Sequence, residues 1–351
     1  MPAALDGESE SGFHRRRDWC GIEFSMLLFI PQNYRSNAAV RCIGHRSVLQ
    51  RLMQCTALGI AAHCVFFVNL SVTCVKHITL ITPLLEVGRR LTRLKKYILD
   101  LTVTENLRIH ANYVLIKLTH CNPLPEMLPG QFAEIRIDGS NTTFLRRPIS
   151  INFVDREKNE IWFLVQLVGD GTRKLATVQK GDIVNVILPL GKGFTIPEAT
   201  DKKVLLVGGG VGTAPMLNLG YELKQKGFSP VFLLGARSKN DLLQLDMFNT
   251  LGEVYTTTED GSLGEKGYVT MHSMLSANRF DMIYTCGPKP MMMAVAKYAK
   301  ANDIECEVSL ENTMACGVGA CLCCVEKTDE GHLCVCKEGP VFNIKKLLWQ
   351  I

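Results

Sequence analysis

The sequence predicts an α/β fold joined to a β-barrel: an antiparallel barrel comes first, then a doubly wound α/β domain, then a small domain rich in cysteine. Three observations predict this arrangement. Short strands separated by turn residues are followed by strands that alternate with helices, and closely spaced cysteines lie near the C-terminus. We place the three domains at residues 95–198, 199–305 and 306–351.

Length, composition and charge limit the classes of protein. The chain has 351 residues, of which 47% are hydrophobic, so it can bury a large core and should divide into two or three units. The formal net charge is +5, but the basic excess lies before residue 97, so nucleic acid is not implied as a partner. Cysteines number 14 and no clear secretory leader precedes them, which indicates a reducing compartment; we expect the cytoplasm.

Residues 1–94 differ from the rest of the chain, since they show no regular helical or strand period. We expect an atypical extension that is either disordered or the product of a start site assigned too far upstream. The stretch 56–75 has about the length of a membrane span, but His63 and Asn69 interrupt it, so we expect no membrane anchor. The functional chain is expected to begin near Lys95.

The first domain is predicted to be a closed antiparallel barrel, because short alternating strands follow one another with glycine turns between them. Six strands are expected, at residues 97–104, 112–119, 132–137, 149–154, 161–167 and 183–188.

A candidate ligand contact in the barrel is Arg146-Arg147-Pro148-Ile149-Ser150. An arginine before a proline-stiffened strand can direct its guanidinium at a phosphate, and the serine hydroxyl can reach a ring heteroatom. The alternative is a solvated arginine on the barrel rim.

A second candidate is Gly169-Asp170-Gly171-Thr172, which comes before a helix-like run at 173–178. This order puts Gly171 and Thr172 at a helix N-terminus, where unpaired amides suit a pyrophosphate. The alternative is an ordinary glycine turn with a threonine N-cap.

The second domain alternates buried strands with helices, which predicts a small doubly wound sheet with a nucleotide at the strand ends. Strands are expected at residues 203–207, 231–234, 253–257 and 282–285, and helices near 216–225, 241–250 and 289–301.

A glycine-rich loop, GGGVGTAP, follows the first of these strands and opens a helix. Glycine lets phosphates or a ring approach the backbone, so Gly209, Gly210 and Gly212 are candidate dinucleotide contacts together with Thr213. Thr213 stands where G-x-G-x-x-G has its third glycine, which favours a related turn over the standard Rossmann fingerprint.

A second loop, Cys286-Gly287-Pro288, ends another strand at the same edge of the sheet. This position predicts that Cys286 and Gly287 lie near a nicotinamide at the switch point of the sheet. The alternative for Cys286 is a small buried thiol.

The cysteine-rich segment holds Cys316, Cys321 and Cys324 at C-x4-C-x2-C spacing, with Cys336 twelve positions later. This spacing matches the plant-type [2Fe–2S] ligand pattern, and glycines between the cysteines let the loop fold closely around a cluster. Structural zinc, a redox disulfide and buried thiols are the alternatives. By spacing alone, Cys334 competes with Cys336 as fourth ligand.

The barrel, the glycine-rich α/β domain and the CGP loop together resemble the ferredoxin–NADP reductase superfamily over residues 95–306, on the segments RPIS, GDGT, GGGVGTAP and CGPKPMM. With the cysteine segment included, the chain is similar to one subfamily, the electron transfer subunits of NAD-dependent dihydroorotate dehydrogenase B. The segments RRPIS, EDGSLGEKGYV, YTCGPKPM, ENTMACGVGAC and CKEGPVF carry that resemblance to the end of the chain.

The resemblance implies FAD in the barrel, NAD in the α/β domain and a [2Fe–2S] cluster in the last domain. The implied FAD contacts are Arg147, Pro148, Ile149, Ser150, Leu164, Val165, Gln166, Gly171 and Thr172. The NAD contacts expected from the two loops are Gly209, Gly210, Gly212, Thr213, Cys286 and Gly287. The implied cluster ligands are Cys316, Cys321, Cys324 and Cys336. The KEGPVF sequence after Cys336 selects it over Cys334, and Cys323 is expected to be a spectator.

The resemblance also implies a function and a partner. An FMN-containing catalytic subunit would oxidise dihydroorotate to orotate in de novo pyrimidine (UMP) biosynthesis, and this oxidoreductase subunit would pass the electrons to NAD+, in a heterotetramer of two copies of each subunit. No catalytic acid–base residue is expected in this chain. Glu259 and Asp260 would disfavour a 2′-phosphate and Arg237 would attract one; we expect NAD.

Two other functions remain open at this point. One is an FAD/[2Fe–2S] reductase subunit of a ferredoxin–NADP transhydrogenase or a sulfhydrogenase-like complex. The other is a membrane-tethered electron-input module that uses residues 56–75.

Overall fold

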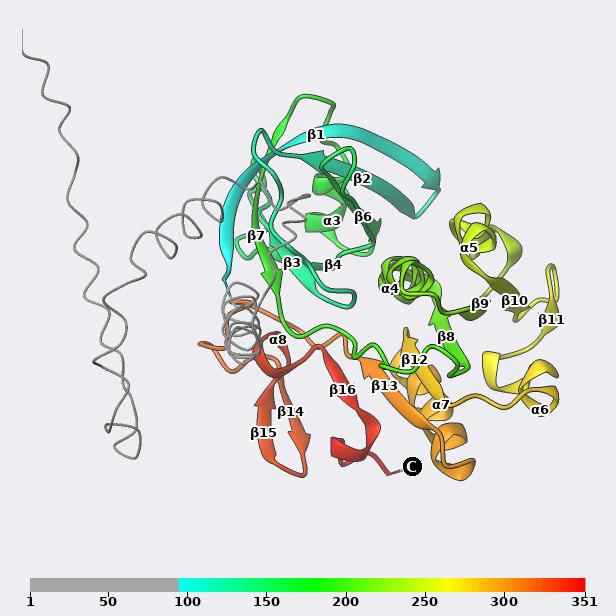
Figure 1. Cartoon of the computed structure of the whole chain (residues 1–351). Coiled ribbons are helices and arrows are strands. Elements are labelled where there is room, and N and C mark those ends of the chain that lie inside the picture. Colours follow the sequence, from blue (N-terminus) through cyan, green and yellow to red (C-terminus); the bar gives the residue numbers. More distant parts are fainter. Residues whose placement is uncertain (1–94, 351) are drawn as a thin grey trace, which may run out of the picture. The chain divides into compact units, whose positions relative to one another are not determined.

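The structure is a computed structural model, and it describes residues 95–350 (Figure 1). The predicted extension at residues 1–94 and its apolar stretch lie outside the described residues. Within the described part of the chain, no helix is both long enough and apolar enough to cross a membrane.

The first sheet is antiparallel and has seven strands in the order β4-β3-β7-β1-β2-β6-β5. It curls around its own interior (Figure 1). The strands are β1 (Tyr97–His110), β2 (Tyr113–Thr119), β3 (Phe132–Ile135), β4 (Arg147–Ser150), β5 (Phe153–Asp155), β6 (Glu160–Gln166) and β7 (Ile183–Leu190).

The strand expected at 149–154 is two strands, and this change explains how the sheet curls. The Ile151 amide donates to the Gln131 carbonyl beside β3, whereas the next amide, of Asn152, donates to the Trp162 carbonyl on β6. The chain therefore crosses from one edge of the sheet to the other at this point. The predicted antiparallel barrel is confirmed as a curled sheet, but no ladder joins β4 to β5, so the expected closure by strand pairing was wrong.

The interior of the curled sheet is filled by side chains that alternate along each strand. Leu101 and Val103 of β1 meet Ile116 and Leu118 of β2, and all four are buried. Full burial of each such side chain stabilises the fold by about 1.5–3 kcal/mol. Short helix α3 (Asp170–Leu175) contributes Leu175 to the same core.

The second sheet has the order β11-β10-β9-β8-β12-β13-β16, parallel except for β16. The strands are β8 (Val204–Gly209), β9 (Val231–Ala236), β10 (Glu253–Thr258), β11 (Glu265–Lys266), β12 (Met282–Cys286), β13 (Glu305–Ser309) and β16 (Val341–Asn343). The helices are α4 (Ala214–Gln225), α5 (Leu245–Leu251), α6 (Met274–Ala277) and α7 (Lys289–Ala301).

Strand β8 shows why this sheet is covered on both faces. Leu205 and Val207 belong to the hydrophobic core that includes Val295 of α7, whereas Leu206 belongs to the core that includes Leu217 of α4. Successive side chains of a strand point to opposite faces, so a run of apolar residues needs a helix on each side. The doubly wound domain predicted from the sequence is confirmed (Figure 1).

The C-terminal segment contributes to this second sheet. The boundary that the sequence predicts between residues 305 and 306 lies at the start of β13, and β16 pairs with β13 in antiparallel fashion. Between these two strands lie the cysteine loop, the hairpin β14 (Val325–Thr328) and β15 (Gly331–Cys334), and helix α8 (Val335–Glu338). Both ends of the cysteine-rich segment are therefore fixed to the α/β sheet.

Candidate functional site

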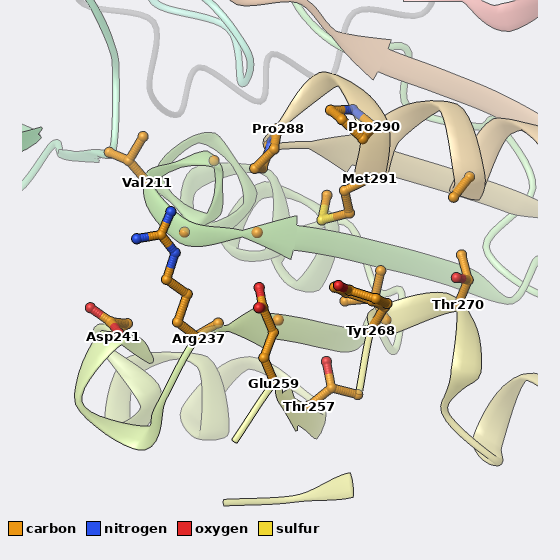
Figure 2. Close-up of a pocket in the computed structure, with 18 of the residues that line it drawn as sticks. Val211, Arg237, Asp241, Thr257, Glu259, Tyr268, Thr270, Pro288, Pro290 and Met291 are labelled. Carbon is orange, nitrogen blue, oxygen red and sulfur yellow. The ribbon is translucent and has the colours of Figure 1, made fainter. Parts of the chain in front are cut away.

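A cavity of about 620 Å³ opens at the carboxyl ends of the parallel strands (Figure 2). Gly209 ends β8, Arg237 follows β9, Glu259 follows β10 and Gly287 follows β12, and all four line the cavity. The carboxyl edge of a doubly wound sheet is where such folds bind nucleotides. The cavity matches the position that the sequence predicted for a dinucleotide.

The glycine loop owes its composition to close packing against the CGP loop. A Cβ on Gly209 would lie 2.4 Å from the Met291 sulfur, and a Cβ on Gly212 would lie 2.5 Å from the Cys286 carbonyl carbon. Gly210 adopts the left-handed conformation, with φ +56°. Glycine here lets the two loops pack together and leaves the backbone of Gly209, Gly210 and Gly212 open to the cavity.

Two of the predicted NAD residues do not line the cavity. Thr213 is buried, and its hydroxyl donates to the Gly210 carbonyl, 3.0 Å away, in the tight turn that leads into α4. Cys286 is fully buried, and its thiol donates to Glu311 Oε1 at 3.7 Å. Burial, followed by the Glu311 carboxylate, raises the pKa of this thiol well above its usual range. The structure thus favours the small buried thiol that the sequence left open for Cys286.

The charged side chains of the cavity gather near the ends of β9 and β10. Figure 2 shows Arg237 between Asp241 and Glu259, and all three line the cavity. Asp260 does not line it, and its carboxylate accepts hydrogen bonds from Ser262. Of the two acidic residues considered from the sequence, Glu259 alone faces the nucleotide position.

A second cavity, of about 410 Å³, lies on the outer side of the curled sheet. Seven of the nine predicted FAD residues line it: Arg147, Pro148, Ile149, Ser150, Leu164, Gln166 and Thr172. Val165 does not, because strand alternation directs its side chain into the core of the sheet while Leu164 and Gln166 face outward. Gly171 lies behind Arg147, where a Cβ would be 2.7 Å from the guanidinium Nε.

The two neighbouring arginines have different surroundings. The Arg146 guanidinium donates to the Glu134 and Asn185 carbonyls and to Asn185 Oδ1, so it ties β3 to β7. Arg147 donates to the carbonyls of Leu145 and Arg146, next to it in the chain, and lines the cavity. Only Arg147 faces the second cavity.

The turn before α3 differs from the sequence expectation. The helix begins at Asp170 with Gly169 as its N-cap, three residues earlier than predicted. Thr172 is the third residue of the helix; its hydroxyl accepts from the amides of Val168 and Gly169, both at 3.1 Å, and donates to the Gly169 carbonyl. Thr172 is therefore not the N-cap but the residue that holds the turn together.

The two cavities are adjacent, because Gln166, Val211 and Glu311 line both of them. Gln166 comes from the curled sheet, Val211 from the glycine loop and Glu311 from the segment after β13. Burial raises the pKa of Glu311, although its hydrogen bond from Cys286 lowers it. Molecules in the two cavities would meet at these three side chains.

The cysteine loop directs backbone amides at sulfur atoms. Cys316 Sγ accepts from the amides of Val318, Ala320 and Cys321 at 3.3–3.5 Å. Cys336, although distant in sequence, accepts from the Gly319 amide at 3.1 Å, and its own amide donates to Cys324 Sγ at 3.3 Å. Positive φ values of +65° at Gly317 and +81° at Gly319 make this loop possible. The four predicted ligands thus form two hydrogen-bonded pairs, Cys316 with Cys321 and Cys324 with Cys336, and the Gly319 amide ties Cys336 to the loop; we call this set the cysteine network.

The pKa values of the thiols indicate which chemistry suits this network. Burial raises the pKa of Cys316, but the amides of Val318, Cys321 and Ala320 outweigh burial and lower it to about 6. Burial and the neighbouring Cys324 raise the pKa of Cys336 to about 12. Thiolates this close repel one another, so bound iron would be needed to hold all four ionised.

The surplus cysteines have different environments. Cys323 is exposed, and Cys334 is half-buried on β15. Burial, then Cys324 and Cys316, raise the pKa of Cys334, so this thiol also lies near the network.

Among residues 95–350 no three His, Cys, Asp or Glu side chains form a group able to hold a single metal ion. A [2Fe–2S] cluster instead takes its protein ligands in two pairs, one pair for each iron.

Sequence reasoning missed several lining residues. Asn112 and Tyr113 line the first cavity, and Leu310, Glu311, Asn312, Met314 and Pro340 line the second. Glu311, Asn312, Met314 and Pro340 belong to the ENTMACGVGAC and CKEGPVF segments, but nothing in those segments marks them as lining a cavity that distant segments complete. Glu311 carried one usable signal, because a carboxylate two residues after β13 lies at the same sheet edge as the CGP loop.

Comparison with known proteins agrees with this geometry. A family model described as the iron–sulfur cluster binding domain of dihydroorotate dehydrogenase B matches residues 311–348, and an oxidoreductase NAD-binding domain model matches residues 206–297. A solved NADH-dependent reduced ferredoxin–NADP oxidoreductase, studied for flavin-based electron bifurcation, is similar with a TM-score of 0.64 and 28% identity, over 71% of this chain and 90% of that chain.

Curated relatives match most of the described chain. A protein of Fusobacterium nucleatum named dihydroorotate dehydrogenase B (NAD(+)), electron transfer subunit, is 38% identical over 250 residues, which are 69% of this chain and 95% of the relative. A protein of Caldanaerobacter subterraneus with the same name is 41% identical over 225 residues, 63% of this chain and 87% of the relative. These matches confirm an oxidoreductase subunit with FAD, [2Fe–2S] and NAD as cofactors. The chain belongs to the family of electron transfer subunits of NAD-dependent dihydroorotate dehydrogenase B.

Proposed function

We propose that this chain carries electrons from an FMN-containing catalytic subunit, which oxidises dihydroorotate to orotate, through its [2Fe–2S] cluster and FAD to NAD+. The step belongs to de novo pyrimidine (UMP) biosynthesis. The observation that carries the proposal is the position of the second cavity. It shares Gln166, Val211 and Glu311 with the dinucleotide cavity, and its wall includes Met314, two residues before Cys316, and Pro340, four residues after Cys336.

This order of sites matches the chemistry that the three groups supply. Nicotinamide exchanges two electrons as hydride, an iron–sulfur cluster exchanges one at a time, and a flavin does either. A flavin cavity that borders both of the other sites is therefore the arrangement that electron transfer needs. The chain itself contributes positioning, exclusion of water and electrostatics.

In the flavin cavity, Arg147 is proposed to pair with the pyrophosphate beside the start of α3, because its guanidinium lies against Gly171. Leu164 and Gln166 of β6, with Ile149 and Ser150 of β4, form the wall against which the ring would lie. Val165 supports this wall from the core of the sheet, and Thr172 holds the turn before α3 in shape.

In the dinucleotide cavity, the backbone of Gly209, Gly210 and Gly212 is proposed to approach the phosphates, and Gly287 the nicotinamide. Thr213 and Cys286 support these loops from behind. The Glu259 carboxylate is proposed to accept the ribose hydroxyls, which disfavours a 2′-phosphate and selects NAD over NADP.

In the cysteine segment, Cys316, Cys321, Cys324 and Cys336 are proposed as the cluster ligands, with the loop amides stabilising their negative charge.

The same loop carries two exposed apolar side chains: Val318 and Leu322 expose 39% and 64% of their surface. Apolar side chains exposed around an electron port suit a partner subunit. We propose that the catalytic subunit docks here, in a cytoplasmic heterotetramer of two copies of each subunit.

An anaerobic titration of the purified chain with NADH, followed by visible and EPR spectra, tests the cofactor assignment. Bleaching of the flavin followed by a rhombic S = 1/2 signal is the expected result. Bound zinc in place of iron would overturn the cluster assignment.

A second experiment tests the reaction. When the FMN subunit, dihydroorotate and NAD+ are added to the chain, NADH should form. If the FMN subunit is active and no NADH forms, the dihydroorotate assignment is wrong.

A second candidate is a reductase subunit of a ferredoxin–NADP transhydrogenase or a sulfhydrogenase-like complex. The similarity to the ferredoxin–NADP oxidoreductase structure supports it. Electron exchange with ferredoxin at a rate exceeding that with the FMN subunit would favour this candidate.

A further inference from the structure

A reciprocal pair of side-chain amides joins the curled sheet to the α/β domain. Asn152 Nδ2 donates to Gln244 Oε1 at 3.0 Å, and Gln244 Nε2 donates back to Asn152 Oδ1 at 3.0 Å. Asn152 Nδ2 also donates to the Ala214 carbonyl at 3.1 Å. Asn152 is fully buried and Gln244 is half-buried, so the Asn152 amide group is shielded from water, and leaving such a group unpaired costs about 1–3 kcal/mol.

The three residues of this network lie in segments that build the two cavities. Asn152 is two positions after Ser150 of the flavin cavity, and its amide is held by the Trp162 carbonyl. Ala214 directly follows the glycine loop and lines the flavin cavity. Gln244 ends the loop that carries Asp241 of the dinucleotide cavity. The Asn152 side chain is thus bonded to one α/β-domain segment beside each cavity: Ala214 at the flavin cavity and the Asp241–Gln244 loop at the dinucleotide cavity.

Gln244 has an unfavourable left-handed backbone conformation at the start of α5. Its φ is +57°, in the left-handed region, which costs a residue with a Cβ roughly 1–2 kcal/mol. Its carbonyl accepts from the amides of Met247 and Phe248, so it also begins α5. The strained backbone directs the amide side chain back toward Asn152.

Apolar packing alone does not fix this interface in one position. Leu115, Trp162 and Leu164 of the curled sheet pack with Ala214 and Leu243 of the α/β domain. Such contacts are non-directional and allow small sliding movements. The reciprocal amide pair, with Asn152 buried and Gln244 half-buried, is directional, so it can select one relative position of the two surfaces.

We propose that the Asn152–Gln244 pair is a positioning device that sets the nicotinamide cavity against the flavin cavity. The inference rests on the proposed function. The proposed function moves hydride from reduced flavin to NAD+; in the reverse direction, which the test below measures, the C4–H bond of NADH would break and an N–H bond would form on the flavin. The hydride brings both electrons, NADH becomes NAD+, and a proton from solvent completes FADH2. A displacement of about 1 Å between reacting groups can slow such a step by about 100-fold.

The main test variant is Gln244→Asn. Asparagine keeps the amide and tolerates the left-handed backbone, but it is one methylene too short to reach Asn152. We expect flavin reduction at saturating NADH, measured anaerobically by stopped flow, to slow at least about 10-fold, with loss of the charge-transfer absorbance between nicotinamide and flavin. NADH affinity, FAD content and the cluster EPR signal should stay close to wild type, and Tm should fall only by the few degrees that one unpaired buried amide costs.

Arg156→Gln is the matched control, because Arg156 pairs with Glu222 across the same interface at 2.8 Å but is solvent-exposed. It should leave the rate and the absorbance unchanged. Asn152→Ala and the double variant with Gln244→Asn test coupling: the double variant should be no slower than Asn152→Ala.

The outcomes distinguish failure of the positioning role from failure of the proposed function. A wild-type chain with FAD that NADH does not reduce removes the proposed function itself. A reducible wild type, together with a Gln244→Asn variant of equal rate and equal charge-transfer absorbance, overturns the positioning role alone. The positioning role is also overturned if Arg156→Gln slows reduction as much as Gln244→Asn.

Discussion

The contacts of single residues show which glycines are required by close packing and which cysteine is joined to the cysteine loop. Gly212 contacts the Cys286 backbone and Gly317 contacts the Glu134 side chain, so both are glycines because of close approach. Cys336 is joined to the cysteine loop through Gly319, whereas its neighbour in spacing, Cys334, lies on β15. These contacts turn a spacing pattern into specific roles that substitutions can test.

The fourth ligand is tested by Cys336→Ser, with Cys323→Ser as the exposed control. We expect Cys336→Ser to lose most of the iron and the EPR signal, because one iron loses a thiolate. Cys323→Ser should retain both. Iron and sulfide analysis with EPR makes the measurement, and a normal cluster in Cys336→Ser with loss in Cys334→Ser would transfer the role to Cys334.

The packing of the two loops is tested by Gly212→Ala. Its new Cβ would lie 2.5 Å from backbone atoms of Cys286 and Gly287, which cannot move independently of β12. We expect a loss of about 1–3 kcal/mol in the free energy of unfolding and weaker NADH binding. Gly169→Ala is the stability control, because its Cβ would meet nothing within 4 Å. Urea unfolding measures the free energy of unfolding, and a fluorescence titration measures NADH binding. Equal losses in Gly212→Ala and Gly169→Ala would contradict the role of close packing.

At the scale of elements, β12 and β13 hold the segment that links the two sheets. The Thr195 amide donates to Glu307 Oε2 at 2.9 Å, and the Tyr284 hydroxyl donates to the Thr195 carbonyl at 2.6 Å. Burial raises the pKa of Glu307, although its bonds from Thr195 lower it. The connection between the sheets therefore depends on a carboxyl group that is costly to ionise.

This raised pKa predicts a pH dependence of stability. The folded state holds the Glu307 proton more tightly than the unfolded state, so its favourable contribution is complete below the usual glutamate pKa. It is lost as pH rises through the higher folded pKa. Glu307→Gln should therefore gain stability relative to wild type between pH 5 and pH 8. Urea unfolding at both pH values gives the difference in the free energy of unfolding between Glu307→Gln and wild type. A difference that is the same at the two pH values would contradict the prediction.

At the scale of the whole described molecule, the proposed flavin cavity shares lining residues with the dinucleotide cavity and is also lined by Met314 and Pro340, which lie close in sequence to Cys316 and Cys336. The α/β sheet unites these sites, because the glycine loop follows β8, the CGP loop follows β12 and the cysteine segment leaves β13 and returns as β16. A single sheet edge thus positions the nucleotide loops, while its last two strands anchor the cysteine segment.

The proposed partner surface is tested at this scale by Leu322→Glu. The charge should reduce co-purification with the FMN subunit about 10-fold or more, because it would be buried without a partner. NADH-driven reduction of a dye by the chain alone should persist. Leu263→Glu, with 41% of the side chain exposed between β10 and β11, is the control. Full assembly of Leu322→Glu with the FMN subunit would place the interface elsewhere.

Local patterns predicted much of the fold. Helix α7 occupies residues 289–301, as the sequence predicted, and the four expected strands of the α/β domain, β8, β9, β10 and β12, fall within two residues of their expected ranges, whereas β11, β13 and β16 were not expected. The expected strand at 149–154 was split, because hydrogen bonds to two distant strands, at Gln131 and Trp162, act on adjacent residues. No local period contains that information.

By itself, the sequence determined the order of the domains, the chemical type of each site and the family resemblance, because strand alternation, glycine loops and cysteine spacing are local properties. Only the tertiary structure decided that Arg147, not Arg146, faces the second cavity, and that Val165, Thr213 and Cys286 are buried outside the linings of the two cavities. It also brought Glu311 to the meeting point of the two cavities. The physical reason is that side-chain direction and burial depend on which strand, from far along the chain, packs alongside.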